Sequence, residues 1–339
     1  MALKILKKIG VYLFVLIGLS ILVFVIARVI PGDVARQALG PHASEETVEL
    51  LREKMHLNEP LPVQYILWLK DAVQLDLGES VQTRRPVIED IKAYLPATLE
   101  IVLLSAVCLV IGGIVLGVIS MKFTGKWVDL LIRILSYLGI CSPAFVWGVL
   151  LMLLFGYVWP ILPTTGRINI SLAPPATVTG MFTVDYLLQG DIAGFWDAFK
   201  HLIIPAIALM LGGMAQAARL TRGNMAENAM KDYIQAEKAY GVPENRILTK
   251  YLLRPSLIPT ITVMAMDISS IFGNGFLVEN LFNFPGLARY GLGAMLNKDI
   301  NAISGVVMVL GIIFILLNLL SDIIVAWLDP RVRLMGGSN

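Results

Sequence analysis

The chain has 339 residues, of which 57% are hydrophobic and only 15% are charged. Soluble domains carry about 25% charged residues, so the composition excludes an ordinary water-soluble domain and indicates a polytopic membrane protein. The formal net charge of +2 says nothing about partners, and the sequence shows no repeat, low-complexity tract or long run of like charge.

Six apolar segments are each long enough to cross a hydrocarbon layer, which takes about 20 residues. Five are free of charge and a sixth contains one acidic residue, Asp267; in chain order they cover residues 9 to 27, 101 to 121, 134 to 166, 202 to 218, 255 to 278 and 300 to 321. The first is longer than the apolar region of a signal peptide, so it is predicted to be a membrane anchor. The third exceeds one span, and we expect its helix to end near Trp159 and Pro160, an aromatic pair typical of the interface.

The distribution of Lys and Arg predicts the orientation. With the N-terminus inside, the inner segments hold 15 of the 27 basic residues and the longer outer segments hold 11. Both termini are therefore predicted to be cytoplasmic, and residues 219 to 256 are predicted to form the large cytoplasmic loop.

The first outer loop is predicted to hold two amphipathic surface helices. Ser44 is a plausible N-cap for the first, and Val48, Leu51 and Met55 line one face of it. The second follows Pro62, with the apolar residues Tyr65, Ile66, Leu69 and Val73. These helices could receive a soluble partner or lie on the membrane surface.

No catalytic or metal-binding constellation is evident, so an enzyme is not predicted. A phosphate-binding Gly-x-x-x-x-Gly-Lys-Ser/Thr loop is absent, as is a nucleophile with its base. His42, His56 and His201 lack metal-ligand spacing and read as ordinary surface residues. Cys108 and Cys141 lie in apolar runs and behave as small hydrophobes.

Asp267 is the one deep ionisable residue of the predicted spans, about 12 Å along a helix from Pro259. An intramembrane carboxylate is a candidate for lining a solute path. The alternative is a structural side chain, hydrogen-bonded to a neighbouring helix or protonated in place. A single such group gives little support for a transporter driven by an ion gradient.

Within the cytoplasmic loop, Asp232 and Gln235 suggest a capping box, and Gly241 is a natural helix terminator. A two-turn helix fits between them, and Pro243 can occupy the first turn of the next helix. The short helix would present Tyr233, Ala236, Glu237 and Tyr240 on one face, either to a partner's groove or to the membrane interface.

This loop resembles the coupling loop of permease subunits in ATP-binding-cassette importers, with Gly241 and Ala236 matching its glycine and first alanine. Gln235 and Glu237 depart from its opening glutamate and second alanine. The resemblance implies ATPase-coupling roles for Tyr233, Ala236, Glu237, Ala239 and Gly241.

The whole chain resembles the dipeptide, oligopeptide and nickel permease family, in its first-subunit branch, the oligopeptide/dipeptide permease B type. The segments that carry this are IPGD (30 to 33), LNEPLPVQYILWL (57 to 69), LDLGES (75 to 80), LPATLEIVLL (95 to 104), ILPTTGR (161 to 167), LIP (257 to 259), VENLFNFPGLARYG (278 to 291) and LDPRVR (328 to 333).

The resemblance implies an all-α membrane fold, the six-helix transmembrane domain of a type I ABC importer with a cytoplasmic coupling helix. It predicts an N-terminal anchor helix over 1–30, an extracytoplasmic loop with amphipathic helices over 31–96, and a core permease domain over 97–339 with five further spans and the coupling loop 219–256. It also implies a bacterial or archaeal inner membrane. It implies a sister permease, two ATPase subunits and an external substrate-binding protein as partners. ATP and Mg²⁺ would be used by the ATPases, and this chain would bind no cofactor.

The stretch APPATVTGMFTVDYLLQGD (173 to 191) resembles peptide-type members and favours di- or oligopeptides. Nickel or another small solute is the alternative within the family. A secondary transporter that uses Asp267, or a membrane assembly protein without transport, remain alternatives outside it.

Overall fold

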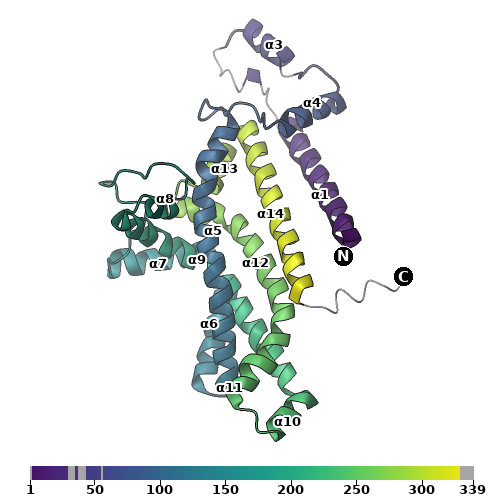
Figure 1. Ribbon diagram of the computed structural model, residues 1–339. Coiled ribbons are helices and arrows are strands. Elements are labelled where there is room, and N and C mark those ends of the chain that lie inside the picture. Colours follow the sequence, from purple (N-terminus) through teal and green to yellow (C-terminus); the bar gives the residue numbers. More distant parts are fainter. Residues whose placement is uncertain (1, 30–34, 37–42, 55, 329–339) are drawn as a thin grey trace. The chain divides into compact units, whose positions relative to one another are not determined.

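The computed structural model describes residues 2–29, 35–36, 43–54 and 56–328, and among these residues it is helical with one isolated bridge between Glu79 and Pro86. The motif IPGD and most of LDPRVR lie outside the described residues. The helices, shown in Figure 1, are α1 (Ala2–Val29), α3 (Glu45–Lys54), α4 (Leu61–Val73), α5 (Val87–Lys122), α6 (Trp127–Cys141), α7 (Ala144–Met152), η1 (Leu153–Val158), α8 (Phe182–Leu188), α9 (Ile192–Ala229), α10 (Asp232–Ala239), α11 (Glu244–Arg246), η2 (Ile247–Leu252), α12 (Leu253–Leu281), α13 (Leu287–Leu296) and α14 (Ile300–Leu328).

Several described helices are long and apolar enough to cross a membrane, as predicted. Four stretches meet this condition alone: Val87–Lys122, Ile192–Ala229, Glu244–Leu281 and Ile300–Ile324. The bent pair Trp127–Cys141 and Ala144–Val158 makes a fifth if it is counted as one span, and Gly10–Ile26 is a shorter apolar stretch within α1. The multi-pass character is confirmed, whereas the count of six spans stays a prediction.

The helices extend beyond the apolar runs that identified them. The segment predicted to span from 101 begins at Val87, and the one predicted from 202 runs over Ile192–Ala229. Residues 219 to 229, assigned to the cytoplasmic loop, therefore belong to α9. Hydropathy locates the apolar part of a helix, but polar residues with good helix propensity continue it into water.

The third predicted span is broken in the middle. Its helix ends at Val158, just before Trp159 as expected, but α6 and α7 meet at an angle of 110°. Ser142 has an extended backbone, with φ −100° and ψ 129°. The residue before a proline is driven out of the helical region by the proline ring, so Pro143 divides the segment in two.

The chain divides into two compact units, and the first comprises residues 1–95 and 287–315. In it, Ser44 caps α3 as predicted, since Thr47 N donates to Ser44 Oγ at 3.2 Å. Val48 is buried as expected, but Ile66 and Val73, predicted for an apolar face of α4, are exposed. Asp299 caps α14 by accepting from Ala302 N and also accepts from Ser80 Oγ at 2.6 Å.

The second unit, residues 96–286 and 316–339, contains the long helices that pack most closely. A Cβ added at Gly113 would lie 2.5 Å from Ala217 Cβ, and one added at Gly117 would lie 2.5 Å from Thr221 Cβ. Gly113 and Gly117 on α5 thus form a small-xxx-small surface against α9. Close backbone approach of this kind stabilises helix pairs in lipid, where no hydrophobic force drives them together.

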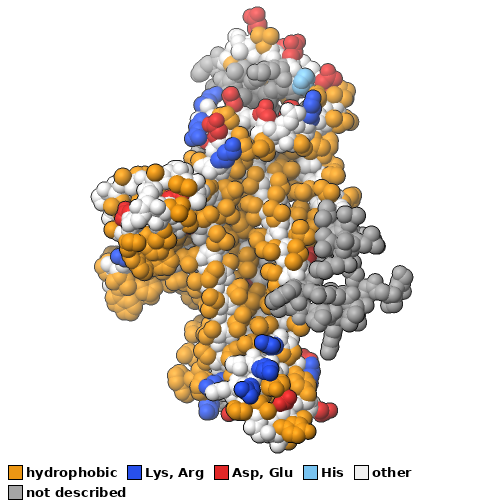
Figure 2. All heavy atoms as spheres, in the orientation of Figure 1, with side chains coloured by type: hydrophobic (Ala, Val, Ile, Leu, Met, Phe, Trp, Pro, Cys, Tyr) orange, Lys and Arg blue, Asp and Glu red, His pale blue; other side chains and the backbone are white. Residues whose placement is uncertain are grey.

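Charge in the second unit is concentrated at one end. On the face shown in Figure 2, apolar side chains cover the long helices, and Lys, Arg, Asp and Glu gather around α10 and α11. An apolar belt that ends in charged groups is the distribution expected of helices that cross a bilayer and emerge into water.

Candidate functional site: a coupling helix and a polar pocket

The predicted two-turn helix is present as α10, Asp232–Ala239, but it begins differently from the prediction. Its N-cap is Lys231, which makes no side-chain capping hydrogen bond, and Asp232 is its first helical residue. The capping box of Asp232 and Gln235 is therefore wrong. The carboxylate of Asp232 can still favour the start of the helix, because the N-terminal end of the macrodipole is positive.

The end of α10 is as predicted, with Gly241 at φ +74°. Gly241 N donates to Lys238 O at 3.0 Å and Val242 N donates to Glu237 O at 3.1 Å. This pair of bonds is the Schellman arrangement, which satisfies the last helix carbonyls and needs a left-handed residue. Pro243 then stands immediately before α11, one position earlier than expected.

One side chain, that of Ile234, attaches α10 to the neighbouring helices of the second unit. Ile234 is fully buried in an apolar cluster with Met225 of α9 and with Ile247, Leu248 and Leu252 of η2. We call these five residues the Ile234 cluster. Because interiors are close-packed and transmit strain, a displacement of α10 must move the end of α9 and the start of α12, which continues η2.

The residues predicted to contact ATPases lie on the other side of α10. Tyr233, Ala236 and Ala239 are exposed, Gly241 is exposed, and Glu237 is half-buried. The Tyr233 hydroxyl lies 3.4 Å from Tyr251 O. The structure therefore brings the predicted coupling residues together on an accessible helix, opposite the buried Ile234.

We expect Gly241→Val to uncouple ATP hydrolysis from transport, because a β-branched residue resists the positive φ that the helix end requires. An added Cβ would meet nothing within 4 Å, so the effect is backbone strain, about 1–2 kcal/mol or more. The measurement is uptake per ATP hydrolysed in reconstituted vesicles. Gly190→Val is the matched control, because Gly190 has the same φ of +74° and the same open space around an added Cβ but lies outside α10. An equal loss of uptake per ATP in both variants would contradict the coupling role of Gly241.

A polar ladder joins α9 to α12 above the Ile234 cluster. Asn228 Nδ2 donates to Ser256 Oγ at 2.8 Å, and Asn224 Nδ2 donates to Thr260 Oγ1 at 3.2 Å. Ser256 and Thr260 are fully buried. These bonds tie the two helices together over one turn of α12, so that they respond to α10 as a pair.

Asp267 lies farther along α12, about 20 Å from its start at 1.5 Å per residue. It borders a pocket of about 360 Å³ between α6, α7, α9 and α12. Polar lining residues besides Asp267 include Gln216 of α9 and Ser270 and Asn274 of α12. Oδ2 of Asp267 is buried and has no hydrogen-bond partner among the described residues.

The structure thus places Asp267 at the border of a cavity, without an ion-pair partner among the described residues. The Cβ atom of Asp267 lies close to α9, because a Cβ added at Gly213 would lie 3.1 Å from it. A buried acceptor without a partner costs free energy, which a solute with a donor or positive charge could recover. The predicted coupling residues and Asp267 lie at two separate places, and α12 runs from η2, beside α10, to Asp267.

Of the histidines, His42 lies outside the described residues and His201 is buried, so its prediction as a surface residue is wrong. His201 Nδ1 lies 2.8 Å from Asp197 O, one helical turn away. Within the described residues no group of three or more His, Cys, Asp or Glu side chains could hold a metal ion.

Two ion pairs, one buried and one partly buried, escaped the sequence reading. Arg167 Nη2 donates to Glu100 Oε2 at 2.7 Å, with both side chains buried. Asp129 accepts from Arg222 Nε at 2.7 Å and from Arg222 Nη2 at 2.9 Å. The paired residues are 67 positions apart in the first pair and 93 in the second. The sequence shows only a single charged residue near the end of an apolar run. Which residue of opposite charge pairs with it depends on the tertiary structure.

Comparisons with known proteins agree with this architecture. Residues 113–334 match the family described as "Binding-protein-dependent transport system inner membrane component", and residues 1–102 match its N-terminal part. The chain is 36% identical over 323 residues to the "Probable D,D-dipeptide transport system permease protein DdpB" of Escherichia coli strain K12, covering 95% of each chain. It is 35% identical to the "Dipeptide transport system permease protein DppB" of Alkalihalophilus pseudofirmus, covering 94% of this chain and 96% of the relative.

A third relative, the "Glutathione transport system permease protein GsiC" of Escherichia coli O6:H1, is 32% identical and covers 93% of each chain. The matches run through the spans, the coupling loop and the polar pocket alike. Membership implies ATPase and substrate-binding subunits as partners and a role in transport rather than catalysis. This chain is a permease of the binding-protein-dependent transport system inner membrane component family.

Proposed function

We propose that this chain is one of two permease subunits that form the path of an ATP-driven importer for di- or oligopeptides. The observation that carries the proposal is the end-to-end similarity to permeases named for dipeptide transport, at 36% and 35% identity. The partner would be a sister permease of the same fold. Two cytoplasmic ATPases would use ATP and Mg²⁺, and a binding protein would deliver the peptide.

The described contacts support a mechanical route from the ATPases to the path. An ATPase would dock on Tyr233, Ala236, Glu237, Ala239 and Gly241 and displace α10. The Ile234 cluster transfers that displacement to α9 and α12, and the Asn224 and Asn228 ladder makes these helices move together. Because Asp267 and its pocket lie on the same two helices, the pocket would change shape with them. The cytoplasmic placement of α10 and both termini follows the Lys and Arg distribution.

The proposal is tested by reconstituting the chain with its partner subunits in vesicles. We expect uptake of a labelled dipeptide that requires the binding protein and ATP and that persists when ion gradients are collapsed. Uptake of Ni²⁺ instead would assign the other substrate class of the family. Uptake that survives ATP depletion but stops without a proton gradient would sink the importer proposal in favour of a secondary transporter.

We expect Asp267→Asn to reduce dipeptide uptake, because the change removes the charge from the pocket while keeping its shape. A charge-assisted hydrogen bond contributes about 1.5–3 kcal/mol, so the apparent affinity for peptide during uptake should fall roughly tenfold or more. Ser270→Ala changes the same lining without altering its charge and should have little effect. Unchanged uptake by Asp267→Asn across peptides and pH would mark Asp267 as structural.

A further inference from the structure

A second pocket lies toward the α10 end of the same helices, lined chiefly by α6 and α9. It has a volume of about 240 Å³, and its polar lining consists of Arg133, Arg219 and Arg222 with Ser120, Ser136 and Tyr137. Three arginines around one small pocket are unusual for helices that pack in a membrane, where each buried or interfacial charge needs compensation.

The charges of this pocket do not balance within the described part of the chain. Arg222 is paired with Asp129 through two bonds. Arg133 forms no ion pair in the described residues, and Arg219 makes only a long hydrogen bond of 3.4 Å with Gln216. Asp129 therefore compensates Arg222, whereas Arg133 and Arg219 have no carboxylate partner among the described residues, and the pocket keeps a net positive charge.

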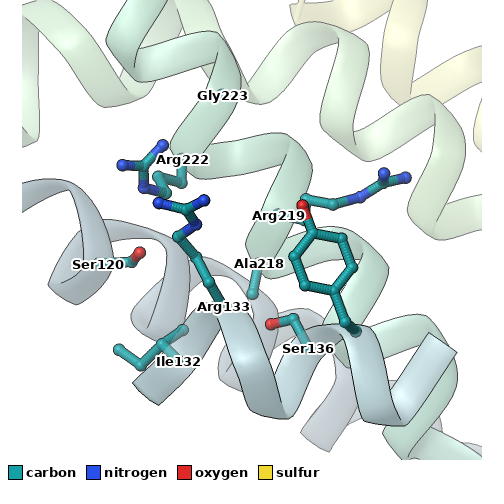
Figure 3. Close-up of a pocket in the computed structure, with 9 residues that line it drawn as sticks. Ser120, Ile132, Arg133, Ser136, Ala218, Arg219, Arg222 and Gly223 are labelled. Atoms are coloured by element: carbon teal, nitrogen blue, oxygen red, sulfur yellow. The ribbon is translucent and has the colours of Figure 1, made fainter. Parts of the chain in front are cut away.

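Figure 3 shows how the arginines are arranged. The side chains of Arg133, from α6, and Arg222, from α9, extend toward the same side of the pocket, while Arg219 lies on the other side. Ser120 lies on the side of Arg133 and Arg222. Like charges repel unless an anion lies between them, and guanidinium groups are suited to bind planar or tetrahedral oxyanions with paired hydrogen bonds.

The surface beside the pocket is apolar and exposed. On α6 the exposed side chains include Leu130, Leu131, Ile134, Leu135 and Leu138. Trp127, at the first residue of α6, is 74% exposed and is typical of a membrane interface. Arg133 follows it by six residues, about 9 Å along the helix, which a long arginine side chain can span to reach the headgroup level.

We propose that this pocket binds the phosphate group of an anionic phospholipid, with its acyl chains lying along the apolar face of α6. Basic pockets between membrane helices on the cytoplasmic side are suited to acidic headgroups. The hydroxyls of Ser136 and Tyr137 add donors for the phosphate oxygens, whereas the Ser120 hydroxyl donates to Asp129. Neither a free phosphate ion nor a peptide carboxylate would use the adjoining apolar face, so a lipid fits the whole surface. The inference does not depend on which solute the importer carries.

The test measures lipid binding to the full-length chain, purified in detergent with the subunits that accompany it. Fluorescent phosphatidylglycerol and phosphatidylcholine are compared at about 0.15 M salt, where the Debye length is about 8 Å and the attraction of more distant charges is largely screened. We expect selective binding of phosphatidylglycerol. Arg133→Gln should weaken it about fivefold, and Arg133→Gln with Arg219→Gln should weaken it about 25-fold, since each basic group near a headgroup contributes about a fivefold factor.

Lys122→Gln is the matched control, because Lys122 is exposed at the end of α5 and does not line the pocket. It removes the same charge from the same end of the unit and should leave binding unchanged. Arg133 is exposed and has no ion pair in the described residues, so the fold should tolerate its replacement. An unchanged melting temperature of the variant verifies this. Arg219→Gln alone serves as a second single variant.

Four results would overturn the proposal: equal binding of the two lipids, equal loss in Lys122→Gln and Arg133→Gln, displacement of phosphatidylglycerol by inorganic phosphate at the same concentration, or its displacement by a dipeptide. The third would assign the pocket to a free anion. The last would place it on the solute path. The lipid site is supported if the arginine variants lose selective binding of phosphatidylglycerol while Lys122→Gln keeps it.

Discussion

Replacing Arg167 by methionine is expected to destabilise the protein by about 3–5 kcal/mol, because it leaves the Glu100 carboxylate buried without its charge partner. The two side chains are only 8% and 5% exposed. Glu100 Oε1 accepts from Thr183 N and from Thr183 Oγ1, at 2.6 Å each, and these bonds alone would have to hold the charge. The measurement is thermal unfolding of the purified chain, together with the amount found in the membrane.

The consequence extends to the loop that joins η1 to α8. Arg167 also donates to Gly180 O at 3.0 Å and lies 3.6 Å over the ring of Phe182. The same loop is held by Asp185, whose carboxylate accepts from the N–H groups of Val178, Thr179 and Gly180. Burial disfavours the charged carboxylate, but these donors outweigh it and hold the pKa of Asp185 below its usual value. Loss of Arg167 removes the second attachment, so increased proteolysis within residues 166–183 is expected.

Two controls isolate the buried charge. Arg52→Met breaks an ion pair of similar length, 2.8 Å, whose side chains are 34% and 50% exposed, and exposed pairs contribute at most about 1 kcal/mol. Adding Glu100→Gln to Arg167→Met removes the unpaired charge and should recover part of the lost stability. If Arg167→Met unfolds at the temperature of Arg52→Met, the buried pair does not stabilise the loop.

Ile234→Ala is expected to uncouple the ATPases and to destabilise the α10 region by about 2–5 kcal/mol, since it opens a cavity in the Ile234 cluster. Ile234 is 0% exposed, and it is the residue of α10 that this cluster contains. With a cavity beneath it, α10 can shift without moving α9 and α12. ATP hydrolysis should continue while uptake per ATP falls several-fold, as measured in reconstituted vesicles.

The matched control is Ile192→Ala, the same chemical change at an exposed residue at the opposite end of α9. It creates no cavity and should leave uptake per ATP at the wild-type value. A further readout is binding of the ATPase subunits, which should persist in Ile234→Ala because the exposed side of α10 is unchanged. An Ile234→Ala protein with normal coupling would show that the displacement of α10 reaches the path by another route.

The local features of the candidate site could be predicted from the sequence. Gly241 indicates the end of α10 because its backbone alone adopts a positive φ without strain, and the length of the helix follows from the preceding polar residues. The start was predicted at the wrong residue, since Asp232 and Gln235 form the pattern of a capping box but the chain enters the helix at Lys231. A pattern of residue types does not specify which carbonyl and N–H groups remain unpaired.

The sequence by itself determined that the protein crosses a membrane, where its apolar helices lie and how its coupling helix ends, because hydropathy, proline and glycine act on neighbouring residues. Only the tertiary structure decided that Ile234 rather than the exposed residues anchors α10 and that Asp267 borders a cavity. The pairing of Arg167 with Glu100 and the position of Arg133, Arg219 and Arg222 around one pocket also follow only from the tertiary structure. Such contacts join residues far apart in the chain, and their partners are fixed by how the helices pack.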